Sequence, residues 1–411
     1  MKIWNRPGAQ RAHRHPIRQA LLLGGLFISL IQINAGRPSF LFPPEVPISL
    51  SQPLRLQWRY QSSQTLNLTP AATRDRLYLP LAQGAIVSLR TDDGGLIWRA
   101  EVGGEISAAP VADQRGVFVA SETGAPAVSA ADSVMRATGS IRALGREAGV
   151  TLWARSLYRP LRGGLAETPT HLFGGAADGR VYAFVKETGE IQWANQFASG
   201  FTSPAVVAGS RLYLGSEDGS LRALDLATGR AVWHYRTHGP IRGPVAVTTE
   251  AVYVGSADGF VYALRADSGK LLWSKRAGAG VQAVGLANGG LIAASLDNFV
   301  YFLSPSGDLL WKRQLAGRIF APPLAAADGI LFTPLSADSC VVLNARDGKQ
   351  VNTLPVGADN NTMASPVVAG NLLLVTTRQG ILAFASTTKQ GQAPPPNRTR
   401  QQLVLTRSSP G

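Results

Sequence analysis

Short runs of alternating apolar and polar residues, separated by glycine-containing turns, recur along most of the chain. In one repeat, strands are expected at Ser203–Val207 and Leu212–Ser216, and an Asp-Gly pair at residues 218–219 leads into a further alternating run. Asp-Gly between two apolar runs favours a tight hairpin, because glycine accepts the positive φ of the turn. With a fourth strand that opens at Trp233, each repeat predicts four short antiparallel strands and no helix.

Tryptophans set the period of this repeat. Six of them are separated by steps of 55, 40, 40, 40 and 38 residues, and Trp58 lies 40 residues before the first. They are Trp98, Trp153, Trp193, Trp233, Trp273 and Trp311. The alternating strand occurs eight times, at Ile86, Ile141, Val181, Leu221, Val261, Val300, Val341 and Leu382. A constant period near 40 residues indicates an array of one supersecondary unit.

An alanine and a glycine precede each tryptophan in the pattern Ala-x5-Gly-x3-Trp. Full matches are Ala143-Gly149-Trp153, Ala183-Gly189-Trp193, Ala223-Gly229-Trp233 and Ala263-Gly269-Trp273. An indole is too large for one small sheet but can lie between two sheets, where alanine leaves room and glycine allows close approach. We therefore predict that each tryptophan docks its sheet onto the next one.

The pattern weakens in three repeats. Ser88 replaces the alanine before Trp98, and Phe302 replaces it before Trp311. Around Gly348, valine and asparagine occupy the alanine and tryptophan places at Val342 and Asn352. We expect the seventh and eighth sheets to be held together less tightly than the others.

Counting the strands predicts a closed ring. The last alternating strand, Ile381–Ala385, has no tryptophan strand after it, and the unused strand Leu54–Tyr60 precedes the first full repeat. Pairing of these two strands would complete the last sheet and remove the free sheet edges. The sequence therefore predicts an all-β fold: an eight-bladed β-propeller of four-stranded antiparallel blades over residues 54–386, closed by an N-terminal strand.

The alanine-glycine-tryptophan repeat resembles the one shared by pyrroloquinoline quinone (PQQ) dehydrogenases and by BamB, the β-propeller lipoprotein of the outer-membrane barrel assembly machinery. The resemblance covers essentially all of residues 54–386 and is closest in character to the BamB-like propellers. It implies the fold but not the function, because one fold hosts unrelated activities. No cysteine follows the apolar N-terminal stretch, so this chain departs from the lipid anchor of BamB.

The two ends of the chain are distinct from the repeats. In residues 1–35, five basic residues precede an apolar stretch at Ala20–Ile33. This pattern is typical of an export signal, which is either cleaved or kept as an anchor. Residues 36–53 are rich in proline and predict an extended tether. Residues 387–411 form a basic, proline-containing tail, interpreted as a disordered end or as a short strand that joins the sheet of a partner.

Charge and chemistry exclude several classes of function. The net charge is +14, of which the two ends hold +5 and +4, so nucleic acid is not an expected partner. The resemblance implies that a PQQ dehydrogenase would carry paired cysteines, a tryptophan under the quinone and Ca²⁺ ligands. The chain has one cysteine, Cys340, expected to be buried in a strand, and every tryptophan except Trp4 belongs to the repeat. No residues are predicted to be catalytic, to bind a metal or to bind a cofactor.

Two features predict a binding surface on the face that carries the connections between blades. The first is an insertion at residues 122–138, because long loops on rigid scaffolds often bind partners, although a neutral loop is the alternative. The second is a set of basic residues in the connections between blades. The predicted partner-binding members are Arg159, Arg162, His238, Arg242 and Arg318, with Arg236 and Arg276 beside them. They are expected to bind an acidic or polar segment, and a solvated basic surface is the alternative.

We therefore expect an exported, monomeric and non-enzymatic scaffold that resembles BamB and assists the assembly of outer-membrane β-barrel proteins. It would be periplasmic, or anchored to the membrane facing the periplasm, and would bind an envelope protein. The alternatives are a PQQ-binding quinoprotein and a ligand-sensing propeller.

Overall fold

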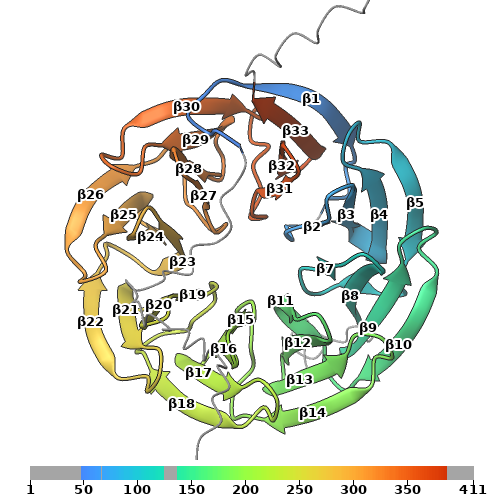
Figure 1. Cartoon of the computed structure of the whole chain (residues 1–411). Coiled ribbons are helices and arrows are strands. Elements are labelled where there is room, and N and C mark those ends of the chain that lie inside the picture. The colour runs from blue at the N-terminus through green and yellow to red at the C-terminus, as the bar shows by residue number, and fades with distance from the viewer. Residues whose placement is uncertain (1–47, 66, 125–136, 387–411) are drawn as a thin grey trace, which may run out of the picture. The chain divides into compact units, whose positions relative to one another are not determined.

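The computed structural model describes residues 48–65, 67–124 and 137–386, which all belong to the larger of two compact units, residues 40–411. These residues form eight antiparallel sheets arranged as a ring (Figure 1). The prediction of an eight-bladed all-β propeller is confirmed. The predicted export signal (residues 1–35), the tail (387–411) and most of the insertion (125–136) lie outside the described residues.

Each blade begins at the centre of the ring and ends at its circumference (Figure 1). Blade 1 contains β2 (Ala71–Ala72), β3 (Arg76–Leu81), β4 (Ala85–Arg90) and β5 (Leu96–Glu101), with the 3₁₀ turn η1 (Ala82–Gly84). Blade 2 contains β6 (Glu105–Ile106), β7 (Val111–Ala112), β8 (Gly116–Thr123), β9 (Thr138–Gly145) and β10 (Thr151–Leu157). Blade 3 contains β11 (Leu161–Glu167), β12 (His171–Ala176), β13 (Arg180–Val185) and β14 (Ile191–Gln196). Blade 4 contains β15 (Val206–Ala208), β16 (Arg211–Gly215), β17 (Ser220–Asp225) and β18 (Ala231–Arg236).

The second half of the ring repeats this order. Blade 5 contains β19 (Ala246–Val247), β20 (Ala251–Gly255), β21 (Phe260–Arg265) and β22 (Leu271–Arg276). Blade 6 contains β23 (Val281–Ala287), β24 (Gly290–Ser295), β25 (Phe299–Leu303) and β26 (Leu309–Gln314). Blade 7 contains β27 (Leu324–Ala326), β28 (Gly329–Phe332), β29 (Ser339–Leu343) and β30 (Gln350–Pro355). Blade 8 contains β31 (Val367–Ala369), β32 (Leu372–Thr377), β33 (Gly380–Ser386) and β1 (Leu54–Gln61).

The N-terminal strand closes the ring as predicted. β1 pairs with β33 from Leu54 opposite Ser386 to Gln61 opposite Gly380. One expected strand is displaced: the inner strand predicted at Ser203–Val207 begins only at Val206. Pro204 has no N–H to donate to a ladder, and the Ser203 hydroxyl accepts a hydrogen bond from the Gly215 N–H instead.

Seven tryptophans dock each blade onto the next, as the repeat predicted. The indole Nε1–H of each donates to a backbone carbonyl in the outer turn of the following blade, over 2.7–3.2 Å. A Cβ added to the glycine of that turn would lie 2.4–2.7 Å from a ring atom, so only glycine fits. The alanine of the repeat lies opposite its tryptophan on the neighbouring strand, for example Ala183 opposite Trp193. Where Phe302 replaces it, the ring stacks on Trp311 with centroids 5.0 Å apart.

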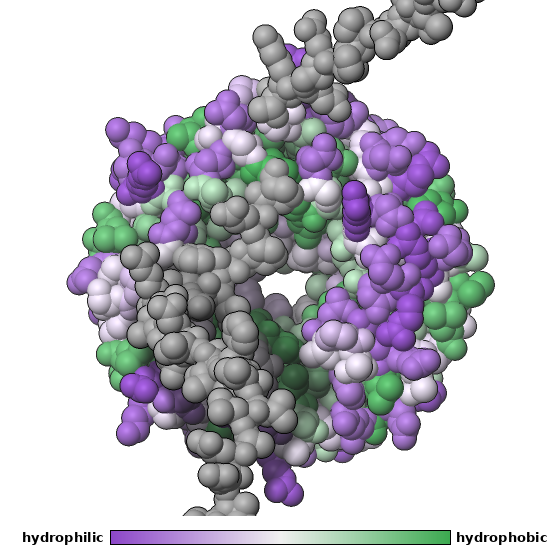
Figure 2. All heavy atoms as spheres, viewed as in Figure 1, coloured by the Kyte–Doolittle hydropathy of each residue, from purple (hydrophilic) through white to green (hydrophobic). Residues whose placement is uncertain are grey.

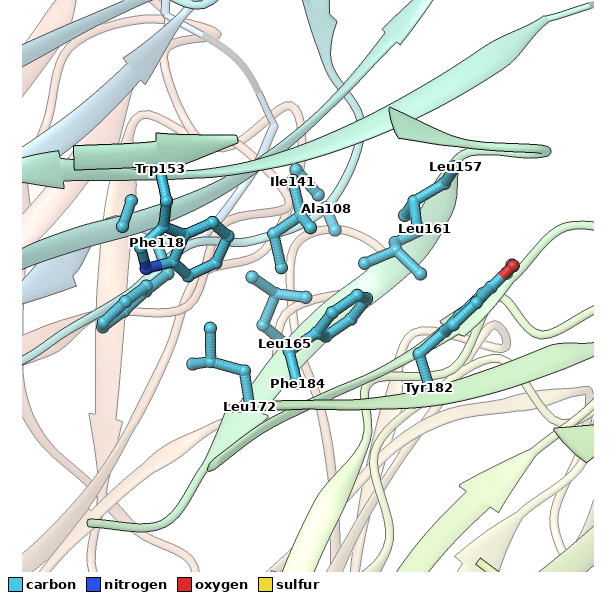
Figure 3. Packing of buried hydrophobic residues seen from close by; sticks show 13 residues of the cluster. Ala108, Phe118, Ile141, Trp153, Leu157, Leu161, Leu165, Leu172, Tyr182 and Phe184 are labelled. Atoms are coloured by element: carbon cyan, nitrogen blue, oxygen red, sulfur yellow. The ribbon is translucent and has the colours of Figure 1, made fainter. Parts of the chain in front are cut away.

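The hydrophobic core consists of layers between neighbouring blades. Between blades 2 and 3, Trp153 lies beside Phe118, and Leu161 and Phe184 belong to the same layer (Figure 3). The predicted burial of Cys340 is confirmed, because its side chain is fully buried in the layer of blades 7 and 8. This burial raises the pKa of the Cys340 thiol to about 12.

The junction of blades 7 and 8 corrects one prediction. Ile48 and Leu50 are buried between these blades, so the packed structure begins before Leu54 and these two residues are not part of the tether predicted at 36–53. The Asp328 carboxylate accepts hydrogen bonds from the backbone N–H groups of Leu50 and Ser51 at 3.0 and 3.1 Å. The N-terminal segment takes the place of the missing tryptophan contact, and the looser attachment expected for the last blades stays a prediction.

Two faces of the ring differ in the loops they carry. On one face, the turns between the third and fourth strands carry the carbonyls that bind the tryptophans. They lie beside the turns that join the first and second strands, as the hydrogen bond from Leu226 N–H to Ser210 O shows. We call this the docking face. The opposite face carries the connections between blades beside the turns of the second and third strands, as the hydrogen bond from Ala177 N–H to Pro160 O shows. We call this the connection face. Within the described residues, no helix is both long enough and apolar enough to cross a membrane.

Candidate partner-binding rim

The predicted basic residues all lie on the connection face. Arg159 lies in the connection from β10 to β11, and Arg162 near the start of β11. His238 and Arg242 lie in the connection from β18 to β19, and Arg318 in the connection from β26 to β27. The structure thus places them on one face, but distributes them over the entries to blades 3, 5 and 7. We call this set the basic rim.

Two members of the basic rim are engaged in ion pairs that the sequence did not reveal. Arg162 Nη2 lies 2.5 Å from Glu122 Oε2, and the Arg242 guanidinium contacts both oxygens of Glu217 at 2.9 and 3.1 Å. In each pair the arginine enters one blade and the glutamate lies at the end of the second strand of the preceding blade. The equivalent positions of Arg162 and Arg242 thus have a structural role, which is to tie neighbouring blades together.

The environment of Glu217 keeps its charge. Burial alone would raise the pKa of this carboxyl, but hydrogen bonds from Arg242 and Thr202, together with the charge of Arg242, outweigh it. The pKa of Glu217 therefore lies below its usual value. Because half of the Arg242 side chain remains exposed, one edge of the guanidinium is still open to a partner.

An exposed aromatic residue, which sequence reasoning missed, lies between two arginines of this face. The Tyr158 ring is 65% exposed and has the guanidinium carbons of Arg159 and Arg180 at 4.8 and 5.3 Å from its centroid. Arg180 also pairs with Asp178 at 3.1 Å. Tyrosine and arginine are the residues that most often dominate binding energy at protein interfaces. No signal in the sequence marks Tyr158, because the repeat motif ends at Trp153 and does not extend to the residues that follow.

The remaining members of the basic rim are more isolated. His238 and Arg318 are exposed, and both make backbone contacts: His238 N–H donates to Asp258 Oδ2 at 2.9 Å, and Arg318 O accepts from Leu335 N–H at 2.8 Å. Arg236 and Arg276 are exposed at the ends of β18 and β22. The insertion follows β8 of blade 2, which ends at Thr123, and Arg159 lies in the connection that leads from the same blade to blade 3.

The family of the chain follows from its sequence. A family model described as "Outer membrane protein assembly factor BamB" matches residues 51–135, 137–243 and 236–407. The chain belongs to this BamB family. A comparison with curated proteins gave no match.

Solved structures share the fold of this BamB family member. BamB from Moraxella catarrhalis is 16% identical, with a TM-score of 0.66 over 83% of this chain and 99% of that one. The computationally designed Ika8 protein is 15% identical, with a TM-score of 0.68 over 80% and 99%. The quinohemoprotein alcohol dehydrogenase from Comamonas testosteroni is 13% identical, with a TM-score of 0.64 over 81% and 76%. At these identities the likeness concerns the fold alone.

The fold family raises the question of a quinone and its calcium ion. Ca²⁺ takes six to eight oxygen ligands, several of them carboxylates. In the stretches 48–65, 67–124 and 137–386, no group of three or more His, Cys, Asp or Glu side chains is arranged to hold a metal ion. The described residues therefore offer no cluster of three such side chains for the calcium ion that the resemblance to PQQ dehydrogenases implies.

Proposed function

We propose that the protein is an exported, non-enzymatic scaffold that acts in the assembly of outer-membrane β-barrel proteins, as the description of its family indicates. The observation that supports this best is the match to the BamB family along nearly the whole chain. The N-terminal basic and apolar residues support export to the periplasmic side. The protein would work as a monomer, since the closed ring has its first and last strands paired with each other.

The partner would bind at the connection face, with the Tyr158 cluster at the centre of the contact. Tyr158 offers a large exposed ring, and Arg159 supplies a guanidinium that a carboxylate of an envelope protein can engage in two hydrogen bonds. Arg162 and Arg242 would contribute charge while holding the blades together. A partner segment with acidic residues around an apolar or aromatic side chain fits this surface.

Crosslinking in the native host followed by affinity purification tests this proposal. The full chain with Tyr158→Ala or Arg159→Glu should lose the envelope partner that the unmodified protein captures. Arg155→Glu is the matched control, because Arg155 lies on β10, the strand directly before Tyr158, is exposed and donates hydrogen bonds to backbone carbonyls. Equal capture by all variants, or the absence of any barrel-assembly component from the purified material, would contradict the scaffold proposal.

A charge swap separates the structural role of Arg242 from a binding role. Arg242→Glu alone places two carboxylates side by side at Glu217, so it should weaken the blade contact as well as the capture of the partner. Adding Glu217→Arg restores the pair in reverse. If the swapped protein has the stability of the unmodified chain and still fails to capture the partner, Arg242 contacts it directly.

A quinone-binding protein is the second candidate, because the fold is shared with a quinohemoprotein alcohol dehydrogenase. Thermal unfolding of the purified protein with PQQ and Ca²⁺ tests this candidate, since a bound ligand raises the melting temperature. An unchanged melting temperature would remove it, and the same measurement with other small molecules tests the ligand-sensing alternative.

A further inference from the structure

An apolar groove opens at the inner strands of blades 4, 5 and 6. Its volume is about 760 Å³, in the range that holds a small ligand or several side chains of a peptide. Its apolar lining comes from three neighbouring blades: Val206 and Ala208, Val245 and Val247, and Val284 and Leu286. Figure 2 shows hydrophobic surface on the wall of the central opening, on the side of blades 3 and 4.

The groove lies on the docking face. The turns Gly209–Ser210 and Thr248–Thr249, which join the first and second strands of blades 4 and 5, form part of its lining. The strands β15 and β19 beside it are the terminal strands of their sheets. A terminal strand presents backbone N–H and C=O groups to which an extended segment can be added.

The described chain ends on this same face. Ala385 lies opposite Leu372, which directly follows the turn at Gly370–Asn371 between the first and second strands of blade 8. That turn is the counterpart in blade 8 of the turn Gly209–Ser210 at the groove. Ser386, the last described residue, is therefore on the face on which the groove opens.

The tail has the length and the composition to reach and fill the groove. Its single run of three consecutive aliphatic residues is Leu403-Val404-Leu405, and residues 387–402 precede it. Sixteen extended residues span about 55 Å at ~3.4 Å each. A compact body of this size has a radius of gyration of about 20 Å, so the tail can cross the ring.

Charge is complementary between the two. The tail contains Lys389, Arg398, Arg400 and Arg407 and no acidic residue. At the groove, Asp267 belongs to the lining but pairs with Arg265 at 2.9 Å, and Arg211 is the basic residue of the lining. Glu250, which follows the lining residue Thr249, is therefore the carboxylate that the arginines on either side of Leu403–Leu405 could engage.

We propose that Leu403–Leu405 of the tail docks in the apolar groove of blades 4–6, as an extended segment along β15 and β19 of its own chain. The leucines would cover the valines of the groove, and Arg400 or Arg407 would lie near Glu250. This contact is independent of the partner proposed for the basic rim, which lies on the opposite face.

Limited trypsin digestion of the full chain tests the contact, because the tail offers cleavage sites at Arg398, Arg400 and Arg407. Mass spectrometry would follow the release of the C-terminal peptides. Leu403→Ser with Leu405→Ser, and separately Val247→Asn in the groove, should each accelerate this release several-fold. Val368→Asn is the matched control, since Val368 and Val247 are both the second residue of an inner strand and both half-buried. It should release the tail at the rate of the unmodified chain.

Every other outcome overturns the proposal. Equal rates in all four proteins would show that the tail is not held in the groove. Equal acceleration by Val247→Asn and Val368→Asn would indicate a general loosening of the ring. If protection of the tail from trypsin depends on protein concentration, the groove binds the tail of a second copy. If the tail is cleaved freely and an added hydrophobic peptide binds the groove, the groove binds a partner instead.

Discussion

Asn352 holds Leu50 at the one blade junction that lacks a tryptophan: its Nδ2 donates to Leu50 O at 3.0 Å and to Gln52 O at 2.7 Å. In the other junctions the indole usually binds the carbonyl seven residues before the next tryptophan, as Trp193 binds Leu226 before Trp233. The corresponding residue before Trp58 is Ser51, which lies between the two carbonyls that Asn352 binds. The segment before β1 therefore plays the part of an outer turn for blade 8.

Replacing Asn352 by alanine should lower the free energy of unfolding by about 1–3 kcal/mol, since two hydrogen bonds at about 0.5–1.5 kcal/mol each are lost. Chemical denaturation followed by tryptophan fluorescence measures the change. Asn195→Ala is the control, because Asn195 also donates to a turn carbonyl, Thr228 O at 3.2 Å, but at an exposed site in a junction that keeps its tryptophan. A loss no larger than that of the control would show that Asn352 does not hold the N-terminal segment.

Asp328 should make this junction sensitive to acid. Burial would raise the pKa of its carboxyl, but hydrogen bonds from Ser49, Ser51 and the backbone outweigh it and bring the pKa below 3.8. The ionised carboxylate therefore stabilises the fold above about pH 4, and this contribution is lost as the pH falls through the folded-state pKa. Asp328→Asn should be less stable than the unmodified chain at neutral pH, and the difference should shrink at about pH 3.

Denaturation at both pH values checks this sign. Asp338→Asn serves as the control, since Asp338 is an exposed turn residue of the same blade. A stability difference for Asp328→Asn that is the same at neutral and acidic pH would contradict an ionised role of the carboxylate.

The repeat made the ring predictable because its contacts are local and periodic. Ala183, Gly189 and Trp193 are close in sequence, and each touches the partner that the motif assigns to it. The segment at Ile48–Ser51 was missed because its partner Asp328 is nearly 280 residues away and the glycine and tryptophan of the motif are absent there.

The basic rim lies on the face of the blade connections, as expected, but the ion pairs of its arginines could not be predicted from a single sequence. Nothing near Arg242 in the sequence indicates that Glu217 of the previous blade neutralises it. Tyr158 was missed for a related reason, because an exposed ring between two arginines has no periodic signature. One signal could have revealed the N-terminal segment: Ser51 lies seven residues before Trp58, the same spacing that separates Leu226, which binds an indole, from Trp233.

Glycine at the outer turns is required by packing as well as by φ, and two positions separate these causes. Gly229 has φ +69°, and an added Cβ would lie 2.5 Å from Cε3 of Trp193. Gly209 has φ +57°, and an added Cβ would meet no atom within 4 Å. Gly209→Ala should cost about 1 kcal/mol for backbone strain, and Gly229→Ala about 2–4 kcal/mol because the indole must also move. Denaturation of both variants measures the difference, and equal losses would mean that the turn does not contact the ring closely.

Lys186 is a buried cation at the junction of blades 2 and 3. Its side chain is 3% exposed, and its Nζ lies 2.6 Å from Glu167 Oε2 and 2.8 Å from Asp113 Oδ2. The same residue offers its backbone carbonyl to Trp153 at 2.9 Å. Burial would raise the pKa of Asp113, but the hydrogen bond from Lys186 and its charge outweigh this effect and hold the pKa below 3.8.

Lys186→Met should therefore destabilise the fold by about 2–4 kcal/mol at neutral pH, because it leaves two carboxylates partly buried without their cation. The loss of stability should become smaller as the pH falls towards about 4, because the Asp113 carboxyl then takes up a proton in the variant and no longer lacks a partner charge. Arg265→Met is the control: its pair with Asp267 at 2.9 Å is more than half exposed on both sides, so its loss should change stability by less than about 1 kcal/mol. Denaturation across this pH range decides the matter, since equal and pH-independent effects of the two variants would show that Lys186 acts only through the packing of its aliphatic chain.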